Sequence, residues 1–335
     1  MCVTGQHRQM LDQVLEAFEV KPDYDLSIMK DKQTLFDITT NILNRIKTVL
    51  EEVKPDVVLV HGDTTTSMAV ALSAFYAKIP VGHVEAGLRT FDKHYPFPEE
   101  INRVFADAVC TYHFAPTETS VQNLIKSAIP KEHIYQTGNT VIDALLHTVK
   151  NNKADLSHIG LNPNLKTILL TSHRRENFGE PIRNICKAVL ELVNTNKSIQ
   201  VVYPVHLNPN VQQPVNELLG NKERIYLIEP MEYAPFSTLM QYAYIIMTDS
   251  GGVQEEAPSL GKPVLVLRST TERPEAVEYG TVKLVGTDTQ KIVTEMQKLL
   301  DDENEYKKMS EAINPYGDGL ACQRITKILK ENLAK

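Results

Sequence analysis

Three acidic residues stand just after predicted strands in the first third of the chain. Asp63 ends VVLVHGD, Glu85 lies in PVGHVEAGLR and Glu99 lies in PFPEEINR. In an open α/β sheet, the loops beyond the carboxyl ends of the strands face a common crevice, so these side chains can meet one ligand. Carboxylates gathered in a crevice can serve as acid and base, because repulsion and burial separate their pKa values.

Each acid also has a simpler interpretation. An Asp after a strand often caps the following helix, and Glu99 with Arg103 fits an ordinary i,i+4 pair on a helix that begins behind a proline. His61 and His83, which flank the acids, suit packed positions at strand ends. The gathering of all these residues in one half of the chain favours a catalytic cluster.

The segment MTDSGGVQEEAP contains a strand end followed by Ser250, Gly251 and Gly252. Glycines let a backbone approach a ligand closely, and the first N–H groups of a helix attract an anion such as a diphosphate. Glu256, one turn into the helix, has a carboxylate that can accept both hydroxyls of a ribose. The alternative is a plain strand–helix turn, in which the helix dipole favours an early Glu.

Basic side chains follow the predicted strand TILLT, where the chain reads SHRREN. Arg174 and Arg175 can hold phosphate oxygens, and His173 can act as an acid or a phosphate ligand near neutral pH. A surface charge cluster is the alternative. His206, in the loop VYPVHLNPNV, suits a structural position as well as a functional one.

A second pair of arginines lies in LRSTTERPEA. Arg268 and Arg273 either clamp a ligand or form salt bridges with Glu272 and Glu275 in the same loop.

Composition excludes several classes of protein. The chain has 335 residues and a net charge of −7, which argues against nucleic acid or an anionic membrane as partner. No apolar run approaches the roughly 20 residues of a membrane span, and no signal peptide opens the chain. The four cysteines are scattered without CxxC spacing, which indicates free thiols in a reducing cytoplasm.

Several cofactor signatures are absent from the sequence. The histidines show no HExxH or similar spacing, so we expect no metal site. Neither GxxxxGK[ST] nor GxGxxG occurs, so a P-loop or a nicotinamide site is not expected, and no cofactor is predicted.

Short apolar runs alternate with helical patterns along the whole chain. The first half predicts strands at DVVLVHG, PVGHVEA, TYHFAPT and HIYQTGN, with helices near 33–52, 65–77, 98–107, 117–127 and 140–150. The second half predicts strands at TILLTSHRRE, SIQVVYPVHLN, RIYLIEP, AYIIMTDSGG, PVLVLRS and TVKLVG. Such alternation gives an α/β fold with parallel sheets. We therefore expect two doubly wound, Rossmann-like domains that face each other across a cleft.

The expected boundaries follow from composition. The first domain spans 1–155, the polar residues near 151–166 form a linker, and the second domain spans 164–317. A terminal helix within 318–335, with Asp318 as its N-cap, is expected to cross back to the first domain. Cys2 to Thr4 resembles the tail of a strand, and a doubly wound domain rarely begins on its second half-motif. We therefore expect the first domain to lack its first strand.

The motifs taken together resemble the non-hydrolysing UDP-N-acetylglucosamine 2-epimerases of bacteria. The resemblance covers nearly the whole chain and is carried by GQHRQMLDQVL, GDTTTS, GHVEAGLRT, PEEINR, HRRENFG, VHLNPNV, DSGGVQEEAP and TTERPEAV. It implies a glycosyltransferase-B-like fold, a cytoplasmic homodimer, and interconversion of UDP-GlcNAc and UDP-ManNAc without cofactor or metal. One departure is that the family opens with a strand and a Gly-Thr-Arg-Pro-Glu loop, which this chain lacks.

The resemblance also implies roles for individual residues. Its catalytic groups match Asp63, Glu85, Glu99, Arg103 and His173. Its nucleotide contacts match Met231, Phe236, Ser250, Gly251, Gly252, Glu256 and Arg273. A second UDP-GlcNAc, bound as an activator, would meet Gln6, His7, Gln9, Arg174 and His206. From residue types alone, Gln6 to Gln9 merely begin a helix.

The implied reaction needs particular chemistry. No carbonyl acidifies the C2 proton of the sugar, so its inversion is easiest by eliminating UDP to a glycal and adding UDP back. This path requires bases, positive groups for the departing UDP, and exclusion of water. Two other functions remain open at this point: a glycosyltransferase that uses a UDP-sugar donor, and a truncated, non-catalytic binder of sugar nucleotides.

Overall fold

The computed structural model describes residues 1–6, 8–30, 32–151 and 153–334. The chain forms two compact units, of which unit 1 is Met1–Asp143 with Gly319–Lys335 and unit 2 is Ala144–Asp318. The division falls inside a helix, at residue 143, whereas the sequence analysis set the end of the first domain at 155. The polar composition of 151–166 drew the expected boundary to the loop that follows that helix.

Unit 1 contains a parallel sheet in the order β3-β4-β5-β6, built from Val58–His61, Val81–Val84, Tyr112–Ala115 and Ile134–Gln136. These strands are the four that apolar runs predict in the first half of the chain. Helices alternate with them: α2 (Leu35–Val53), α3 (Thr65–Tyr76), α4 (Glu99–Val109), α5 (Glu118–Lys126) and α6 (Thr140–Asn151), with a short 3-10 turn at Lys131–His133. The carboxyl ends of β3 and β4 therefore lead into the loops that carry the acids.

The core of unit 1 follows from the pattern of α2. Its residues Ile38, Ile42, Ile46 and Leu50 recur every fourth position and are buried against the sheet and α3. Thr34 caps the helix in a reciprocal capping box with Asp37. The packed core fixes β3 and, with it, the loop that follows.

Two short parallel strands, β1 (Cys2–Val3) and β2 (Tyr24–Asp25), form a separate pair in unit 1, and α1 (Arg8–Ala17) lies between them in sequence. A groove of about 860 Å³ is lined by β1 on one side and by β3 on the other. Leu59, in the middle of β3, is 48% exposed there. The edges of β1 and β3 thus flank an apolar groove.

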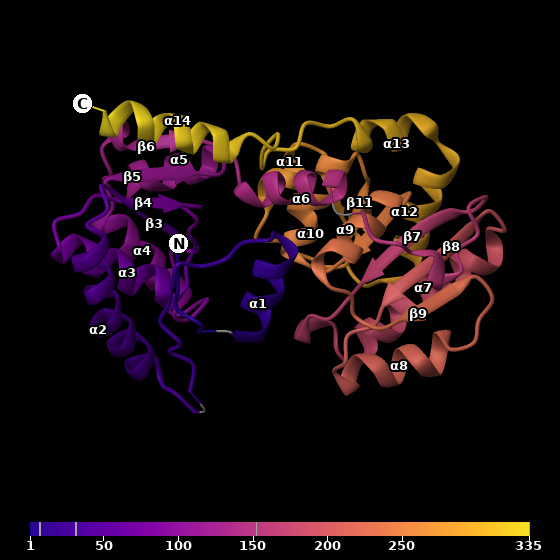
Figure 1. Cartoon of the computed structure of the whole chain (residues 1–335). Coiled ribbons are helices and arrows are strands. Elements are labelled where there is room, and N and C mark those ends of the chain that lie inside the picture. The colour runs from indigo at the N-terminus through magenta and orange to yellow at the C-terminus, as the bar shows by residue number, and fades with distance from the viewer. Residues whose placement is uncertain (7, 31, 152, 335) are drawn as a thin grey trace. The chain divides into compact units, whose positions relative to one another are not determined.

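Helix α14 (Ala321–Leu333) belongs to unit 1 and runs over β5 and β6 (Figure 1). The expectation that Asp318 caps this helix is wrong, because Leu320 occupies the N-cap position and offers no side-chain cap. Instead, the Asp143 carboxylate accepts the backbone N–H groups of Ala321 and Cys322 at 3.1 and 2.9 Å. A tertiary contact replaces the local cap.

Unit 2 has a six-stranded parallel sheet in the order β12-β11-β10-β7-β8-β9. Its strands are β7 (Lys166–Thr171), β8 (Ile199–Pro204), β9 (Ile225–Ile228), β10 (Ile245–Thr248), β11 (Val264–Val266) and β12 (Val282–Leu284). The order reverses between β7 and β10. In a doubly wound sheet, ligands bind beyond the strand ends at such a reversal.

The helices of unit 2 are α7 (Glu180–Thr195), α8 (Pro209–Leu219), α9 (Tyr233–Tyr242), α10 (Gly251–Glu256), α11 (Pro274–Glu278), α12 (Thr289–Asp301) and α13 (Glu303–Ser310), with 3-10 turns at Ser157–Ile159, Arg175–Asn177 and Ala257–Leu260. One face of this sheet packs against α7, α8 and α12, and residues of the opposite face, such as Leu169, Val202 and Ile246, are also buried. No helix in the described part of the chain is long and apolar enough to cross a membrane.

Candidate functional site

Asp63 follows β3 and forms an ion pair with α4. Arg103 donates from Nη2 to Asp63 Oδ2 at 2.5 Å, and Asn102 donates to the backbone carbonyl of Asp63 at 2.9 Å. The Asp63 side chain is 31% exposed, whereas that of Arg103 is 13% exposed. The structure thus brings together two of the predicted catalytic residues, with the carboxylate on the accessible side of the pair.

Glu85 follows β4 and has a left-handed backbone with φ of +65°. A non-glycine residue in this region is uncommon and is typical of functional sites. Its Oε2 lies 3.8 Å from Nε2 of His61 and 3.1 Å from the position that a Cβ on Gly62 would occupy. The Gly62 loop and Glu85 therefore pack directly against each other.

Glu99 begins α4, and the expected i,i+4 pair with Arg103 does not form. Arg103 instead binds Glu100, whose carboxylate also accepts the N–H groups of Thr90 and Phe91 at 3.0 Å each. Glu100 is buried, and the described residues give Glu99 no ion pair or hydrogen bond. Two adjacent glutamates therefore differ: Glu100 holds the preceding loop, whereas Glu99 has no such partner among the residues that the structure describes.

In unit 2, Asp249 at the end of β10 organises the SHRREN loop after β7. Its Oδ2 accepts hydrogen bonds at 2.9 Å from the Ser172 hydroxyl, from the backbone N–H groups of His173 and Arg174, and from Asn177. Asp249 is fully buried, and its Oδ1 lacks a hydrogen bond within the described ranges. One carboxylate thus holds the loop at the strand reversal.

His173 projects from this loop with its Nδ1 3.4 Å from Oδ1 of Asp249. Its ring stacks on that of His206, with centroids 5.7 Å apart and planes 18° from parallel. His206 therefore lies beside the predicted catalytic histidine.

Two guanidinium groups reach the start of α10. A Cβ placed on Gly251 would lie 3.6 Å from Nη2 of Arg174 and 3.9 Å from Nη2 of Arg273. Glu255, one turn on, binds Nε of Arg273. The glycine thus leaves room for a ligand between two cations, and Arg174 joins the residues predicted to contact the nucleotide.

The adjacent loop contains a separate salt bridge. Arg268 is buried and binds Glu272 through Nη1 at 2.6 Å, and Glu176 through Nε at 2.5 Å. Burial alone would raise the pKa of Glu272, but Arg268 and Arg174 hold it down to about 2. Of the two interpretations of Arg268, the salt bridge is the one observed.

Glu256 lies at the end of α10, close to Gly252 and α9. The hydroxyl of Tyr233 donates to its Oε1 at 2.8 Å, and its Oε2 would lie 3.9 Å from a Cβ on Gly252. Burial raises the pKa of Glu256 to about 7, although the Tyr233 hydrogen bond opposes the shift. The second oxygen faces the glycine turn, beside Ser250.

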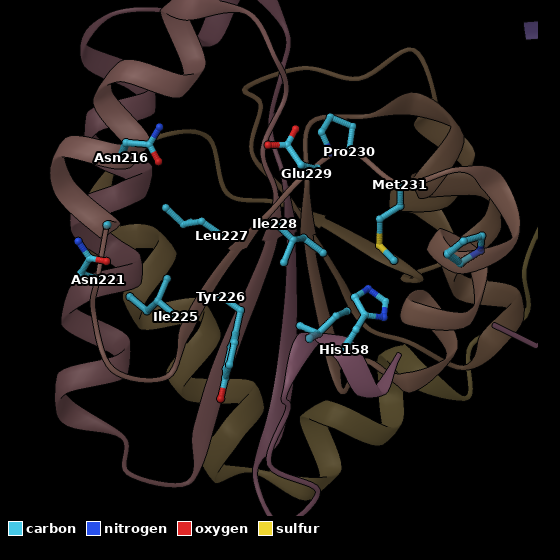
Figure 2. Close-up of a pocket in the computed structure, with 13 residues that line it drawn as sticks. His158, Asn216, Asn221, Ile225, Tyr226, Leu227, Ile228, Glu229, Pro230 and Met231 are labelled. Atoms are coloured by element: carbon cyan, nitrogen blue, oxygen red, sulfur yellow. The ribbon is translucent and has the colours of Figure 1, made fainter. Parts of the chain in front are cut away.

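A cavity of about 870 Å³ lies along β9 in unit 2. Figure 2 shows Ile228 near its centre, with Met231 and His158 on one side and Asn216 and Asn221 on the other. Of the predicted nucleotide contacts, Met231 alone lines this cavity, and Phe236 is half-buried in α9. The cavity therefore does not coincide with the Gly251 cluster.

The residues predicted to bind an activator are only partly described. Gln6 accepts a hydrogen bond from Thr66 at 2.7 Å in unit 1. His7 and the side chain of Gln9 lie outside the described residues. Across the described ranges, no three His, Cys, Asp or Glu side chains gather as a metal site requires.

Comparison with known proteins gives one consistent result. Residues 1–330 match the family described as UDP-N-acetylglucosamine 2-epimerase. The chain belongs to this family. It is 58% identical to the UDP-N-acetylglucosamine 2-epimerase of Salmonella typhimurium, over 98% of this chain and 90% of that protein.

Solved structures of this epimerase family share the fold. A putative UDP-N-acetylglucosamine 2-epimerase from Listeria monocytogenes superposes with a TM-score of 0.92 at 48% identity, covering 96% of this chain and 86% of that one. The enzyme from Neisseria meningitidis, solved bound to UDP-GlcNAc, gives 0.85 at 53% identity, with coverage of 99% and 91%. The expected pair of Rossmann-like, glycosyltransferase-B-like domains is confirmed.

In this epimerase-family chain, sequence reasoning missed three supporting residues. They are Glu100, Asp107 and Asp249, each buried and each bound to the loops that carry predicted site residues. The sequence contained a signal for Asp249, which directly precedes Ser250 at the end of a strand. Asp107 and Glu100 lie on α4, where nothing in their spacing distinguishes them from solvent-facing acids.

Proposed function

We propose that this protein interconverts UDP-N-acetylglucosamine and UDP-N-acetylmannosamine by inverting C2 of the sugar. The observation that carries the proposal is the pairing of Asp63 with Arg103, beside a Gly62 turn that packs against Glu85, in a chain of the epimerase family. The relative from Neisseria meningitidis is named for the same substrate, bound in its crystal structure.

Recognition of the nucleotide is assigned to unit 2. The diphosphate lies at Gly251, where Arg174 and Arg273 supply positive charge. Glu256, when ionised, accepts the ribose hydroxyls through the oxygen that Tyr233 leaves free. Met231 and Phe236 contact the base. These groups also stabilise the charge that develops on UDP as it departs.

The reaction proceeds by elimination and addition. A carboxylate of unit 1 takes the C2 proton, the C2–H electron pair forms the C1=C2 bond, and UDP leaves with the C1–O pair. The glycal then takes a proton on the opposite face of C2, while a phosphate oxygen of UDP bonds to C1. Asp63, Glu85 and Glu99 are the candidate bases, and His173 is the candidate partner of the departing phosphate.

The test is incubation with UDP-GlcNAc alone in deuterated water. We expect UDP-ManNAc to form without any acceptor and to carry deuterium at C2. A product that retains the original hydrogen contradicts the solvent-exchanging base. Absence of UDP-ManNAc, with transfer of the sugar once an acceptor is added, favours the glycosyltransferase instead.

We also propose that the groove between β1 and β3 receives one further parallel strand. The support is the apolar lining of this groove and the exposure of Leu59, together with the position of β1 and β3 at sheet edges, where unpaired N–H and C=O groups can accept another strand. The test extends the chain ahead of Met1 with an apolar strand, a Gly-Thr-Arg-Pro-Glu loop and a helix. Slower amide exchange at Thr4 and Leu59 supports the proposal, and unchanged exchange contradicts it.

Regulation and assembly follow from the same family membership. We propose a cytoplasmic homodimer activated by a second UDP-GlcNAc, which meets Gln6, His7, Gln9, Arg174 and His206. UDP-ManNAc as sole substrate should then react only after a lag, which trace UDP-GlcNAc removes. Linear turnover from the first moment contradicts activation. Analytical ultracentrifugation at the protein concentration of the activity assay tests the dimer, and a sedimenting mass of one chain contradicts it.

A further inference from the structure

His83 lies in the middle of unit 1 with both ring nitrogens on acceptor atoms. Its Nδ1 is 2.6 Å from Oδ1 of Asp107, and its Nε2 is 2.8 Å from the carbonyl oxygen of Gly62. The ring is fully buried. A neutral imidazole has only one N–H, so a neutral ring would leave one nitrogen lone pair facing an oxygen. Both contacts are hydrogen bonds only if the ring is an imidazolium.

Asp107 makes this charge favourable. It is buried and also binds Nη2 of Arg89 at 2.5 Å, so the cluster holds one carboxylate and two cations. Burial by itself lowers the pKa of His83, but the hydrogen bond and charge of Asp107 outweigh it and raise the pKa. With His83 protonated, the cluster of His83, Arg89 and Asp107 carries a net positive charge inside unit 1.

The contact with Gly62 ties two loops together. Gly62 directly precedes Asp63, and its N–H donates to the carbonyl of Val84, directly before Glu85, at 3.0 Å. His83, two residues before Glu85 on the same strand, holds the carbonyl of Gly62. Both the N–H and the C=O of Gly62, at the start of the Asp63 loop, are therefore hydrogen-bonded to residues of β4.

We propose that charged His83 is a positioning residue for the epimerase reaction. It holds the Gly62 carbonyl so that Asp63 and Glu85 keep a fixed separation, and its positive charge interacts with Glu85. The proposal rests on the function given above, since it concerns the spacing of the two candidate bases.

The strand beside β4 provides a matched control. His113 is the register partner of His83 on β5 and is equally buried. Its nitrogens also face two acceptors, the backbone carbonyls of Asp107 and His133 at 2.9 and 3.2 Å, but within the described residues its hydrogen-bond partners include neither a carboxylate oxygen nor an atom of the Asp63 loop. The Asp107 carboxylate, rather than the number of acceptors, therefore distinguishes His83 from His113. Burial lowers the pKa of His113. The two histidines are equally buried, but only His83 contacts the Asp107 carboxylate and the carbonyl of Gly62.

The charged and titratable groups around His83 come from several elements. They are His61 on β3, Glu85 and Arg89 after β4, Asp107 on α4 and His113 on β5. Loss of the His83 charge removes a positive charge that interacts with Glu85. The acid limb of the rate profile then moves to higher pH.

The experiment compares His83→Gln and His113→Gln with the wild-type protein on UDP-GlcNAc. Glutamine has both amide protons on one nitrogen and cannot bridge two opposite acceptors. We expect His83→Gln to lower kcat about 10- to 100-fold, which is the loss expected when reacting groups are displaced slightly. KM should stay within about threefold of the wild-type value. In His83→Gln, the acidic side of the plot of kcat against pH moves to higher pH. In His113→Gln, that plot matches the wild-type one. Equal effects of the two substitutions overturn the proposal.

A second measurement needs neither a folded variant nor turnover. Nitrogen NMR of the wild-type protein reports the protonation of each histidine ring. We expect one ring to stay an imidazolium at a pH where free histidine is neutral, protected from solvent exchange. If every buried ring is neutral at that pH, the proposal is wrong. Wild-type protein that shows this imidazolium but does not epimerise UDP-GlcNAc instead contradicts the proposed function.

Discussion

Single carboxylates in this protein differ in role according to their contacts. Glu99 and Glu100 are neighbours in sequence, yet one is unengaged among the described residues and the other holds a loop through Arg103 and two backbone N–H groups. Glu255 and Glu256 differ similarly, since the first binds the guanidinium of Arg273 and the second accepts a hydrogen bond from the hydroxyl of Tyr233. Within each of these two neighbouring pairs, Glu99 and Glu256 are the members proposed to meet substrate.

The first pair gives a prediction for the acids. Glu99→Gln should reduce turnover roughly 100-fold with folding intact, the scale of acid–base catalysis. Glu100→Gln should lower the free energy of unfolding by about 2 to 4 kcal/mol, because it breaks a buried ion pair. Turnover is measured with UDP-GlcNAc, and stability by urea denaturation. If Glu99→Gln keeps near-normal turnover, Glu99 is not a catalytic residue.

Glu256 gives a prediction for pH. Its pKa is raised to about 7, so the ionised fraction grows from about one tenth at pH 6 to about nine tenths at pH 8. Because the ionised form accepts both ribose hydroxyls, binding of UDP should tighten by up to roughly ninefold over this range. Calorimetry with Glu256→Gln as control separates this effect from titration of UDP itself. Parallel pH dependence in the two proteins argues against the ribose contact.

At the scale of elements, the loops that follow the parallel strands carry most of the proposed site residues. The loop after β3 turns at Gly62 with φ of +66°, and a Cβ there would stand 3.1 Å from Oε2 of Glu85. In unit 2, the loops after β7 and β10 adjoin at the strand reversal, where the hydroxyls of Thr171 and Thr248 lie 2.6 Å apart. Buried His83 on β4 holds the loop after β3, and buried Asp249 after β10 holds the loop after β7.

A glycine substitution tests this element-scale view. Gly62→Ala should cost about 1 to 2 kcal/mol of stability, the penalty of a left-handed L-residue, and should also reduce turnover by displacing Glu85. Gly160→Ala is the control, because its φ of +74° imposes the same strain with no atom within 4 Å of the added Cβ. We expect Gly160→Ala to lose stability alone. Equal turnover in both variants would show that the Gly62 loop does not position Glu85.

At the scale of the whole molecule, each unit has its own buried core. The core of unit 2 gathers around β7 and α7, and that of unit 1 around α2 and α3. The candidate bases belong to unit 1, and the proposed diphosphate and ribose contacts belong to unit 2. Binding and proton transfer can therefore be perturbed separately by substitution.

This division predicts the response to UDP alone. UDP should slow amide exchange in unit 2 at the start of α10 and in the loop after β7, since a ligand stabilises the state that binds it. Exchange in β4 of unit 1 should change less. Hydrogen-exchange mass spectrometry of the full chain with and without UDP measures both. Arg273→Ala should lose the unit 2 protection; if the protection persists, the diphosphate lies elsewhere.

Residue pattern alone predicted the fold class and the strands that carry the site. Apolar runs followed by Gly, Asp and Ser predicted β3, β4, β7 and β10, because a buried parallel strand leaves a local and periodic pattern. The acids, the Ser250-Gly251-Gly252 turn and the SHRREN loop were found in the same way, since strand ends in such a fold lead to ligand loops.

Only the tertiary structure decided which of these groups are already paired. Arg103 pairs with Asp63 and Glu100 rather than with Glu99, Arg174 approaches Gly251, and Asp143 caps a helix that begins 178 residues later. The protonation of His83 likewise depends on two acceptors from separate elements. Such pairings join residues far apart in the chain, and their energies depend on burial and geometry, which residue type and spacing do not encode locally.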